Sequence, residues 1–158
     1  MAYLDVLIEN CKLAKKAEPN SKFAMEAPKN IDDLTVLDKI KSAIYVIKEI
    51  KGDPEYTLSK LKAYKAKKER SCPKINDPSC VLYVGSSTTG LKTRIKQHMG
   101  WGTPKTYALH LAHWFDHGRY EIEISTYDVD AKILLLIEDA LADKLKPAFG
   151  KRGGNINS

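Results

Sequence analysis

The spacing of three strand-like segments constrains the fold of this chain more than any other feature. Residues 42–50, SAIYVIKEI, are dense in β-branched side chains, and residues 81–85, VLYVG, form a shorter apolar run. Residues 119–127, RYEIEISTY, alternate apolar and polar side chains, as a half-exposed strand does. Long stretches with helical patterns separate these segments, so we predict a small mixed sheet that is flanked by helices.

The helices are predicted from apolar periodicity and from the residues that begin and end helices. Asp53 with Pro54, and Thr103 with Pro104, are typical of helix starts, and Pro147 ends the last helix. A stretch rich in proline, asparagine and charge after the first helix is predicted to be a connector. The predicted helices span residues 1–16, 54–69, 89–99, 104–118 and 130–146, and the connector spans residues 18–33.

The charge balance indicates which partners the chain favours. The 158 residues carry a net charge of +6, which favours a polyanion or an acidic membrane surface. Eight basic and three acidic side chains fall between residues 51 and 74, as either a solvated helix face or a patch that follows a nucleic-acid backbone. No apolar run approaches the roughly 20 residues that span a bilayer, and no signal peptide is expected. The three cysteines, an odd number, favour reduced thiols and a cytoplasmic location.

The segment VLYVGSSTTGLKTRIKQH, residues 81–98, is one residue away from a phosphate-binding P-loop. Gly85 and Gly90 have the P-loop spacing, but Leu91 stands where that motif needs a lysine. The inserted residue turns Lys92 by about 100° around the helix axis. We therefore expect a strand, a turn and a helix here, without a nucleotide site.

The last predicted helix places one carboxylate in an apolar stripe. Leu134, Glu138, Leu141 and Leu145 share one helical face because of their spacing. Burying an unpaired carboxylate is costly, so Glu138 must lie beside a cation or a metal. The alternative is a glutamate at the rim of the core that reaches water or pairs with a lysine.

Two further pairs of residues have both an ordinary and a functional interpretation. Arg94 and His98 lie one helical turn apart and point the same way, either as parts of a site or as a surface arginine beside a helix-end histidine. Tyr45 and Tyr83 each sit inside an apolar strand, where core packing with the hydroxyl at the rim is the ordinary arrangement.

Possible metal ligands also occur outside these positions. His110, His113 and His117 follow a helical spacing, but they alternate with apolar residues, which favours a packed or solvated helix over a metal site. Cys72 and Cys80 could supply half of a zinc site, although their spacing is longer than usual. A pair of inert, partly buried thiols is the preferred interpretation of these cysteines.

Six of these positions follow one another in an order that belongs to a known family. They resemble the motifs of the GIY-YIG nuclease superfamily over roughly residues 42–156. Two departures stand out: Ala43 replaces the usual glycine, and the interval between the tyrosine motifs is far longer than the usual hairpin. The matching positions are the tripeptides Ala43-Ile44-Tyr45 and Tyr83-Val84-Gly85, then Arg94, His98, Glu138 and Asn155.

The resemblance implies an α/β (α+β) fold with a small, largely antiparallel three-stranded sheet that is flanked by helices. It divides the chain into an N-terminal helical extension, residues 1–41, and a GIY-YIG-like nuclease domain, residues 42–158. Residues 51–80 would form a helical insertion between the first two strands of that domain.

The resemblance also implies a metal-dependent endonuclease that hydrolyses DNA phosphodiester bonds. Glu138 would hold a single divalent metal, Mg²⁺ or Mn²⁺, and such a site suits a carboxylate together with several waters. Arg94 would grip the scissile phosphate through its planar guanidinium. Asn155 would orient Glu138 or the backbone of the C-terminal tail.

The same resemblance makes Tyr45 the expected general base, with Tyr83 holding the attacking water or the phosphate. The ordinary pKa of tyrosine is near 10, so a neighbouring cation must favour the phenolate form. His98 is the alternative proton acceptor.

DNA is the expected partner, RNA is not excluded, no membrane is expected, and a homodimer is possible. Two rival interpretations remain: a non-catalytic nucleic-acid-binding module on the same scaffold, and a small interaction domain with a basic face. Contacts to the DNA backbone would give affinity rather than sequence recognition. The expected contacts are Lys60, Lys62, Lys65, Lys67, Lys68, Lys92, Lys96, Lys105, Lys151 and Arg152.

Overall fold

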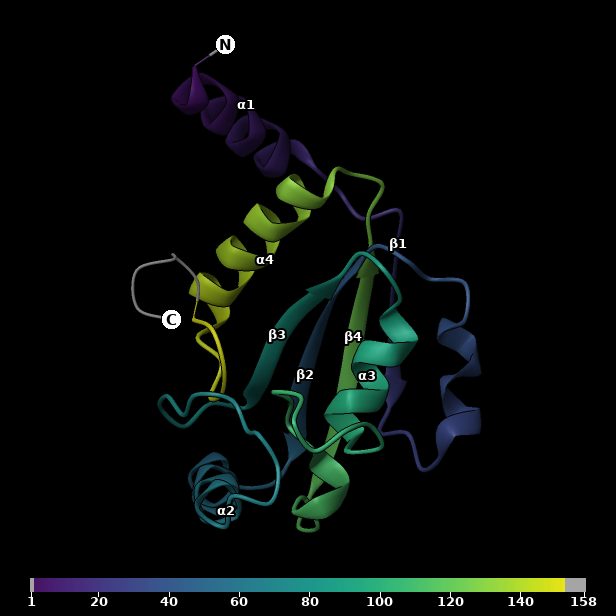
Figure 1. Cartoon of the computed structure of the whole chain (residues 1–158), viewed down its shortest axis with the longest axis vertical. Helices are drawn as coiled ribbons and strands as arrows, with labels where there is room; N and C mark the ends of the chain where they lie inside the picture. Colours follow the sequence, from purple (N-terminus) through teal and green to yellow (C-terminus); the bar gives the residue numbers. More distant parts are fainter. Residues whose placement is uncertain (1, 153–158) are drawn as a thin grey trace.

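In residues 2–152, which the computed structural model describes, one antiparallel sheet of four strands has the spatial order β1-β4-β2-β3 (Figure 1). The α+β class is confirmed. The prediction of three strands is wrong, because β1 adds a strand along the outer edge of β4. The strands are β1 (Ser21–Glu26), β2 (Ala43–Lys51), β3 (Val81–Ser87) and β4 (Arg119–Thr126).

Strand β1 lies inside residues 18–33, which the sequence predicts to be a connector, so that prediction is wrong. Its register places Phe23 opposite Ile124 and Met25 opposite Ile122, and both side chains pack against the core. The other positions of β1 are exposed, so only two apolar residues mark it as a strand. That alternation is too short to separate a strand from a polar connector. The division of the chain at residue 41 stays a prediction.

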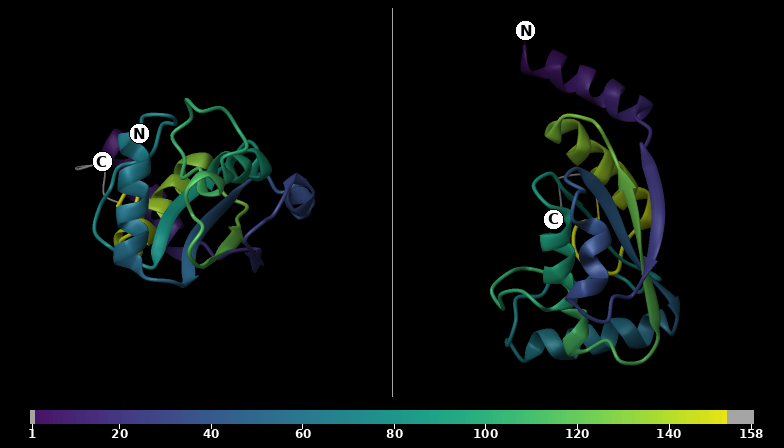
Figure 2. Two further views of the ribbon diagram at one scale, coloured as in Figure 1. Left: turned by 90° about the horizontal axis from the view of Figure 1, so that it is seen from below. Right: turned by 90° about the vertical axis from the view of Figure 1, so that its right-hand side faces the viewer.

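The two faces of the sheet are covered by different helices. Tyr45 and Ile47 pack with α3 and η1 on one face, and Val46 packs with α4 on the other. Helix α1 lies against α4 at one end of the molecule, and α2 lies at the opposite end of the sheet (Figure 1, Figure 2). The helical segments named here are α1 (Tyr3–Lys16), η1 (Ile31–Leu37), α2 (Pro54–Ala66), α3 (Leu91–Met99) and α4 (Ala131–Leu145).

The helix predicted for residues 104–118 is wrong, because this stretch forms a single 3-10 turn, η2 (Leu111–His113). His110 precedes the turn with a φ of 54°, a left-handed conformation that a helix cannot continue through. Side chains bind backbone groups that a helix would use. The Trp114 Nε1–H donates to the Leu109 carbonyl at 2.6 Å, and His98 Nδ1 accepts the Leu109 N–H at 3.2 Å.

The ends of the other helices follow the local sequence closely. Helix α2 begins at Pro54, and the Asp53 side chain accepts the Glu55 N–H at 3.0 Å, as expected of an N-cap. The helix is over by Lys68, whose φ of 57° is left-handed, so α2 is shorter than predicted. No helix within residues 2–152 is long and apolar enough to cross a membrane.

Candidate active site

Two tyrosines from neighbouring strands form the floor of the candidate site. The register of β2 and β3 pairs Tyr45 with Gly85 and Ile47 with Tyr83, so both tyrosines lie on the same face of the sheet. Their rings are nearly parallel, with centroids 6.2 Å apart and an interplanar angle of 11°. Tyr45 is 1% exposed, whereas Tyr83 is half-buried and reaches the edge of the site.

Two glycines make room for these rings. Gly85 lies directly opposite Tyr45 in the sheet, and any Cβ at this position would overlap the Tyr45 hydroxyl. Gly150 has a φ of +84°, and a Cβ there would lie 2.7 Å from Tyr83 Cε2. The sequence predicts Gly85 at the end of a strand, and in the structure it is a strand residue whose missing side chain provides space.

His98 connects α3 to Tyr45 through a buried hydrogen bond. The distance between His98 Nε2 and the Tyr45 hydroxyl is 2.8 Å, and His98 Nδ1 accepts the backbone N–H of Leu109 at 3.2 Å. Burial, then the charges of Arg94 and His110, lower the pKa of His98 well below its ordinary value, so the ring is neutral. A neutral ring that accepts at Nδ1 carries its proton on Nε2, and therefore donates to the Tyr45 oxygen.

This orientation leaves the proton of Tyr45 without a protein acceptor among the described residues. Burial and the neighbouring Tyr83 raise the pKa of Tyr45 above its ordinary value, while the charge of Arg94 acts in the opposite direction. Tyr45 is therefore a phenol here, and its conversion to a phenolate depends on added positive charge.

Arg94 spans the edge of the tyrosine pair. One terminal nitrogen donates to the Tyr83 hydroxyl at 3.2 Å and to the Tyr107 carbonyl at 3.0 Å, and the other donates to the Gln97 side chain at 2.9 Å. The guanidinium is thus held in place by three acceptors from three segments: β3, α3 and the loop that contains Tyr107. Its planar fork is the shape that grips a phosphate.

Glu138 lies in α4 with 8% of its surface exposed, within the apolar stripe that the sequence predicts. The cation beside it is Lys151, whose Nζ lies 3.0 Å from Glu138 Oε2 and 2.6 Å from Asp139 Oδ1. Although burial opposes the charge, the two carboxylates raise the pKa of Lys151 above its ordinary value. The charge of Glu138 also raises the pKa of Tyr45. Glu138 thus acts on Tyr45 through its charge, from the helix that covers the opposite face of the sheet.

The Glu138 carboxylate is an oxygen donor of the kind that Mg²⁺ takes, but Lys151 already supplies a cation beside it. Within residues 2–152 no group of three or more His, Cys, Asp or Glu side chains could hold a metal. One protein carboxylate would have to be completed by waters and phosphate oxygens, which is how Mg²⁺ usually binds. Of the two zinc candidates, Cys72 is buried and Cys80 is exposed. Asn155, the remaining position of the resemblance, lies outside the described residues.

The predicted DNA contacts fall into two groups. Several already bind protein acceptors: Lys60, Lys92 and Arg152 pair with Asp116, Asp38 and Asp77 at 3.3, 2.7 and 3.1 Å, and Lys65 donates to the Pro73 carbonyl at 3.0 Å. Lys151 also belongs to this group, because it faces two carboxylates. The others are exposed or half-exposed to solvent: Lys62, Lys67, Lys68, Lys96 and Lys105.

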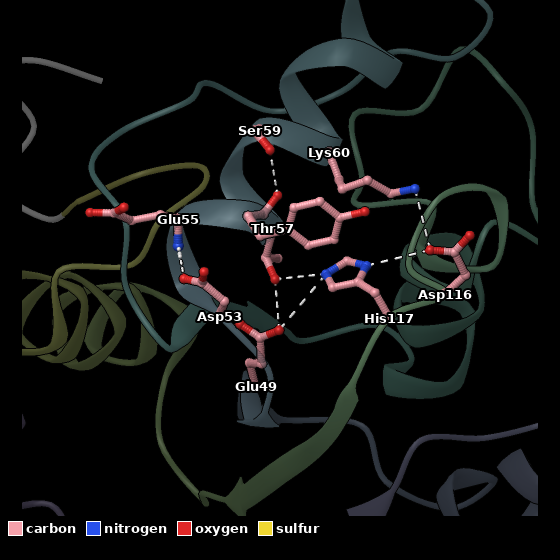
Figure 3. Close-up of polar contacts among 9 residues, drawn as sticks. Glu49, Asp53, Glu55, Thr57, Ser59, Lys60, Asp116 and His117 are labelled. Atoms are coloured by element: carbon pink, nitrogen blue, oxygen red, sulfur yellow. Dashed lines mark hydrogen bonds and ion pairs between the residues drawn. The ribbon is translucent and has the colours of Figure 1, made fainter.

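A second polar cluster, Glu49, Thr57 and His117, was not expected from the sequence (Figure 3). The Thr57 hydroxyl donates to Glu49 Oε2 at 2.6 Å and lies 2.8 Å from His117 Nε2. The signal was present: Glu49 continues the inward-facing alternation of Tyr45 and Ile47 along β2. The three histidines at 110, 113 and 117 share no helix, and His117 belongs to this cluster instead.

The comparisons with known proteins add no relative. No protein-family model, curated protein or solved structure matches this chain. The case for a function therefore rests on the motif positions and on the geometry described above.

Proposed function

We propose that this chain is a metal-dependent endonuclease of the GIY-YIG type that hydrolyses phosphodiester bonds in DNA. The observation that carries the proposal is a connected cluster of Tyr45, Tyr83, Arg94 and His98, in which the charge of the buried Glu138 carboxylate also acts on Tyr45. The cluster draws its residues from β2, β3 and α3, and Glu138 comes from α4.

Tyr45 suits the role of proton acceptor for the attacking water. Its oxygen already receives a hydrogen bond from His98 Nε2–H, which stabilises a phenolate and fixes the direction of the remaining O–H bond. His98 is therefore a donor that positions Tyr45, and not the base itself. A bound Mg²⁺ or Mn²⁺ would supply positive charge that favours the phenolate and neutralises the phosphate.

Arg94 suits the scissile phosphate. Its present acceptors are neutral oxygens of Tyr83, Tyr107 and Gln97, so an anionic phosphate would form stronger, charge-assisted hydrogen bonds. Tyr83 keeps the guanidinium at the edge of the site and can orient a water or a phosphate oxygen with its own hydroxyl proton.

The test is cleavage of plasmid, branched and single-stranded DNA by purified protein with Mg²⁺ or Mn²⁺. Glu138→Ala should abolish cleavage, because it removes the carboxylate that holds the cation. Asp143→Ala, an exposed position on the same helix, is the matched control and should cleave at the wild-type rate. Equal cleavage by wild type and Glu138→Ala would identify a contaminating nuclease and refute the proposal.

The Lys151–Glu138 ion pair favours a second candidate, a non-catalytic module that binds nucleic acid. In that case the ammonium is the permanent partner of the carboxylate and no metal enters. Calorimetric titration with Mn²⁺ separates the candidates. Heat that disappears in Glu138→Ala supports the nuclease, and its absence in wild type supports the binding module.

A further inference from the structure

A basic pocket lies where the end of α2 meets the loop of residues 100–110. Its volume is about 490 Å³, which lies within the range of roughly 300–1,000 Å³ that is typical of small-molecule sites. Two backbone hydrogen bonds join its walls, from Ser71 N–H to the Pro104 carbonyl at 2.8 Å and from Ala108 N–H to the Ser71 carbonyl at 3.3 Å. The charged and aromatic residues that line it are Lys65, Lys68, Glu69, Arg70, Lys105 and Tyr107.

Tyr107 connects this pocket to the candidate active site. Its backbone carbonyl accepts a hydrogen bond from Arg94 at 3.0 Å, while its side chain is 69% exposed. This large aromatic ring is left in solvent on the same residue whose carbonyl holds the Arg94 guanidinium, so it is available to stack on a ligand.

His110 is buried and contacts residues of the pocket wall through both ring nitrogens. Its Nε2 lies 3.1 Å from the Ser71 carbonyl and 3.0 Å from the Thr106 carbonyl, so that nitrogen carries the proton. Its Nδ1 then faces Arg70 at 3.5 Å, and Arg70 also donates to the Gly102 carbonyl at 3.2 Å. Arg70 is therefore fixed in the wall of the pocket, whereas Lys68 and Lys105 are exposed at its rim.

We propose that this pocket binds an unpaired nucleotide of the DNA substrate, with its base stacked on Tyr107 and its phosphates held by Lys68, Arg70 and Lys105. Cations beside an exposed aromatic ring are the combination that binds single-stranded nucleic acid, because every unpaired base presents a face for stacking. Bases inside a duplex are already stacked and cannot contact Tyr107. The inference rests on the proposed function and gives the substrate class: DNA with a single-stranded segment next to the cleaved bond.

The experiment measures binding without cleavage, by fluorescence anisotropy of the full chain in EDTA. The probes are a single strand of about 12 nucleotides, a blunt duplex and a duplex with a single-stranded tail. Tyr107→Ala should weaken binding of the single strand and the tailed duplex by about 10-fold, since stacking contributes roughly 1–3 kcal/mol per base. Tyr107→Phe should bind as wild type does, because it keeps the ring.

Tyr3→Ala, which removes another exposed tyrosine from α1 at the far end of the molecule, is the matched control and should leave all affinities unchanged. The inference is overturned if Tyr107→Ala binds every probe as wild type does, or if it weakens the blunt duplex as much as the tailed one. Failure of the nuclease proposal has a different signature: no cleavage of any substrate while Tyr107-dependent binding persists.

Discussion

Two hydroxyl–imidazole hydrogen bonds in this molecule, one buried and one partly buried, have the same length and different surroundings. Tyr45 lies 2.8 Å from His98 Nε2, and Thr57 lies 2.8 Å from His117 Nε2. Each pair also has a buried glutamate on a neighbouring element. The two pairs differ in whether a protein group accepts the hydrogen bond that the hydroxyl proton can donate.

In the Thr57 cluster the hydroxyl proton of Thr57 already forms a hydrogen bond to a carboxylate. The hydroxyl donates to Glu49 Oε2 at 2.6 Å, so it must accept from His117 Nε2–H. Glu49 is 6% exposed, and Gly52 and Gly118 approach it so closely that a side chain at Gly52 would overlap its carboxylate. This closed arrangement ties the first turn of α2 to the end of β2, which is a structural role (Figure 3).

In the Tyr45 cluster the hydroxyl accepts from the histidine and keeps its own proton available. Its glutamate, Glu138, is neutralised by an ammonium on a loop residue and not by a hydroxyl. A histidine beside a hydroxyl occurs in both clusters, so this pairing alone does not single out the proposed catalytic site. The orientation of the hydrogen bonds distinguishes the two clusters.

Thr57→Val should have the largest effect on stability and none on chemistry. It leaves Glu49 buried without its hydrogen-bond donor, which costs about 1–3 kcal/mol of unfolding free energy. Urea denaturation measures the loss, and Ser59→Ala, on the exposed side of the same helix, is the control. A Thr57→Val protein with wild-type stability would show that the closed cluster does not anchor α2.

His98 should make stability depend on pH. Its pKa is lowered in the folded state, so the unfolded chain binds the proton first as pH falls. Stability is therefore lost below the ordinary histidine pKa of about 6.5, by up to about 1.4 kcal/mol per pH unit. Urea midpoints at several pH values between neutral and mildly acidic conditions should fall more steeply for wild type than for His98→Gln. Parallel slopes would mean that His98 is not a buried neutral ring.

Lys151→Met should strengthen metal binding, with the smallest change in free energy of the three. The substitution keeps the length of the side chain but removes the ammonium that competes for Glu138. We expect the affinity for Mn²⁺, measured by calorimetry, to rise about 10-fold, since a hydrogen bond to a charged group contributes roughly 1.5–3 kcal/mol. Lys146→Met, which breaks an exposed pair with Asp143, is the control. An unchanged affinity would place the metal elsewhere.

Local patterns were sufficient to predict the strands and helices that carry the site. The apolar run of β2 indicated that Tyr45 packs in the core, and the apolar stripe of α4 indicated that Glu138 needs a cation. Contacts between distant segments were beyond prediction. The orientation of His98 depends on the Leu109 N–H, and the cation beside Glu138 comes from Lys151. Strand β1 was missed because it shows only two buried-facing residues, Phe23 and Met25.

The most direct test of the account compares the two hydroxyls in one cleavage experiment. Single-turnover rates with Mg²⁺ on a tailed DNA duplex should fall by at least about 100-fold for Tyr45→Phe, which removes the proposed general base. Thr57→Val should cleave at the wild-type rate once both proteins are shown to be folded. A Tyr45→Phe protein that cleaves as fast as wild type would contradict the central claim. That claim is that the Tyr45 hydroxyl, whose proton has no protein acceptor among the described residues, lies in the active site.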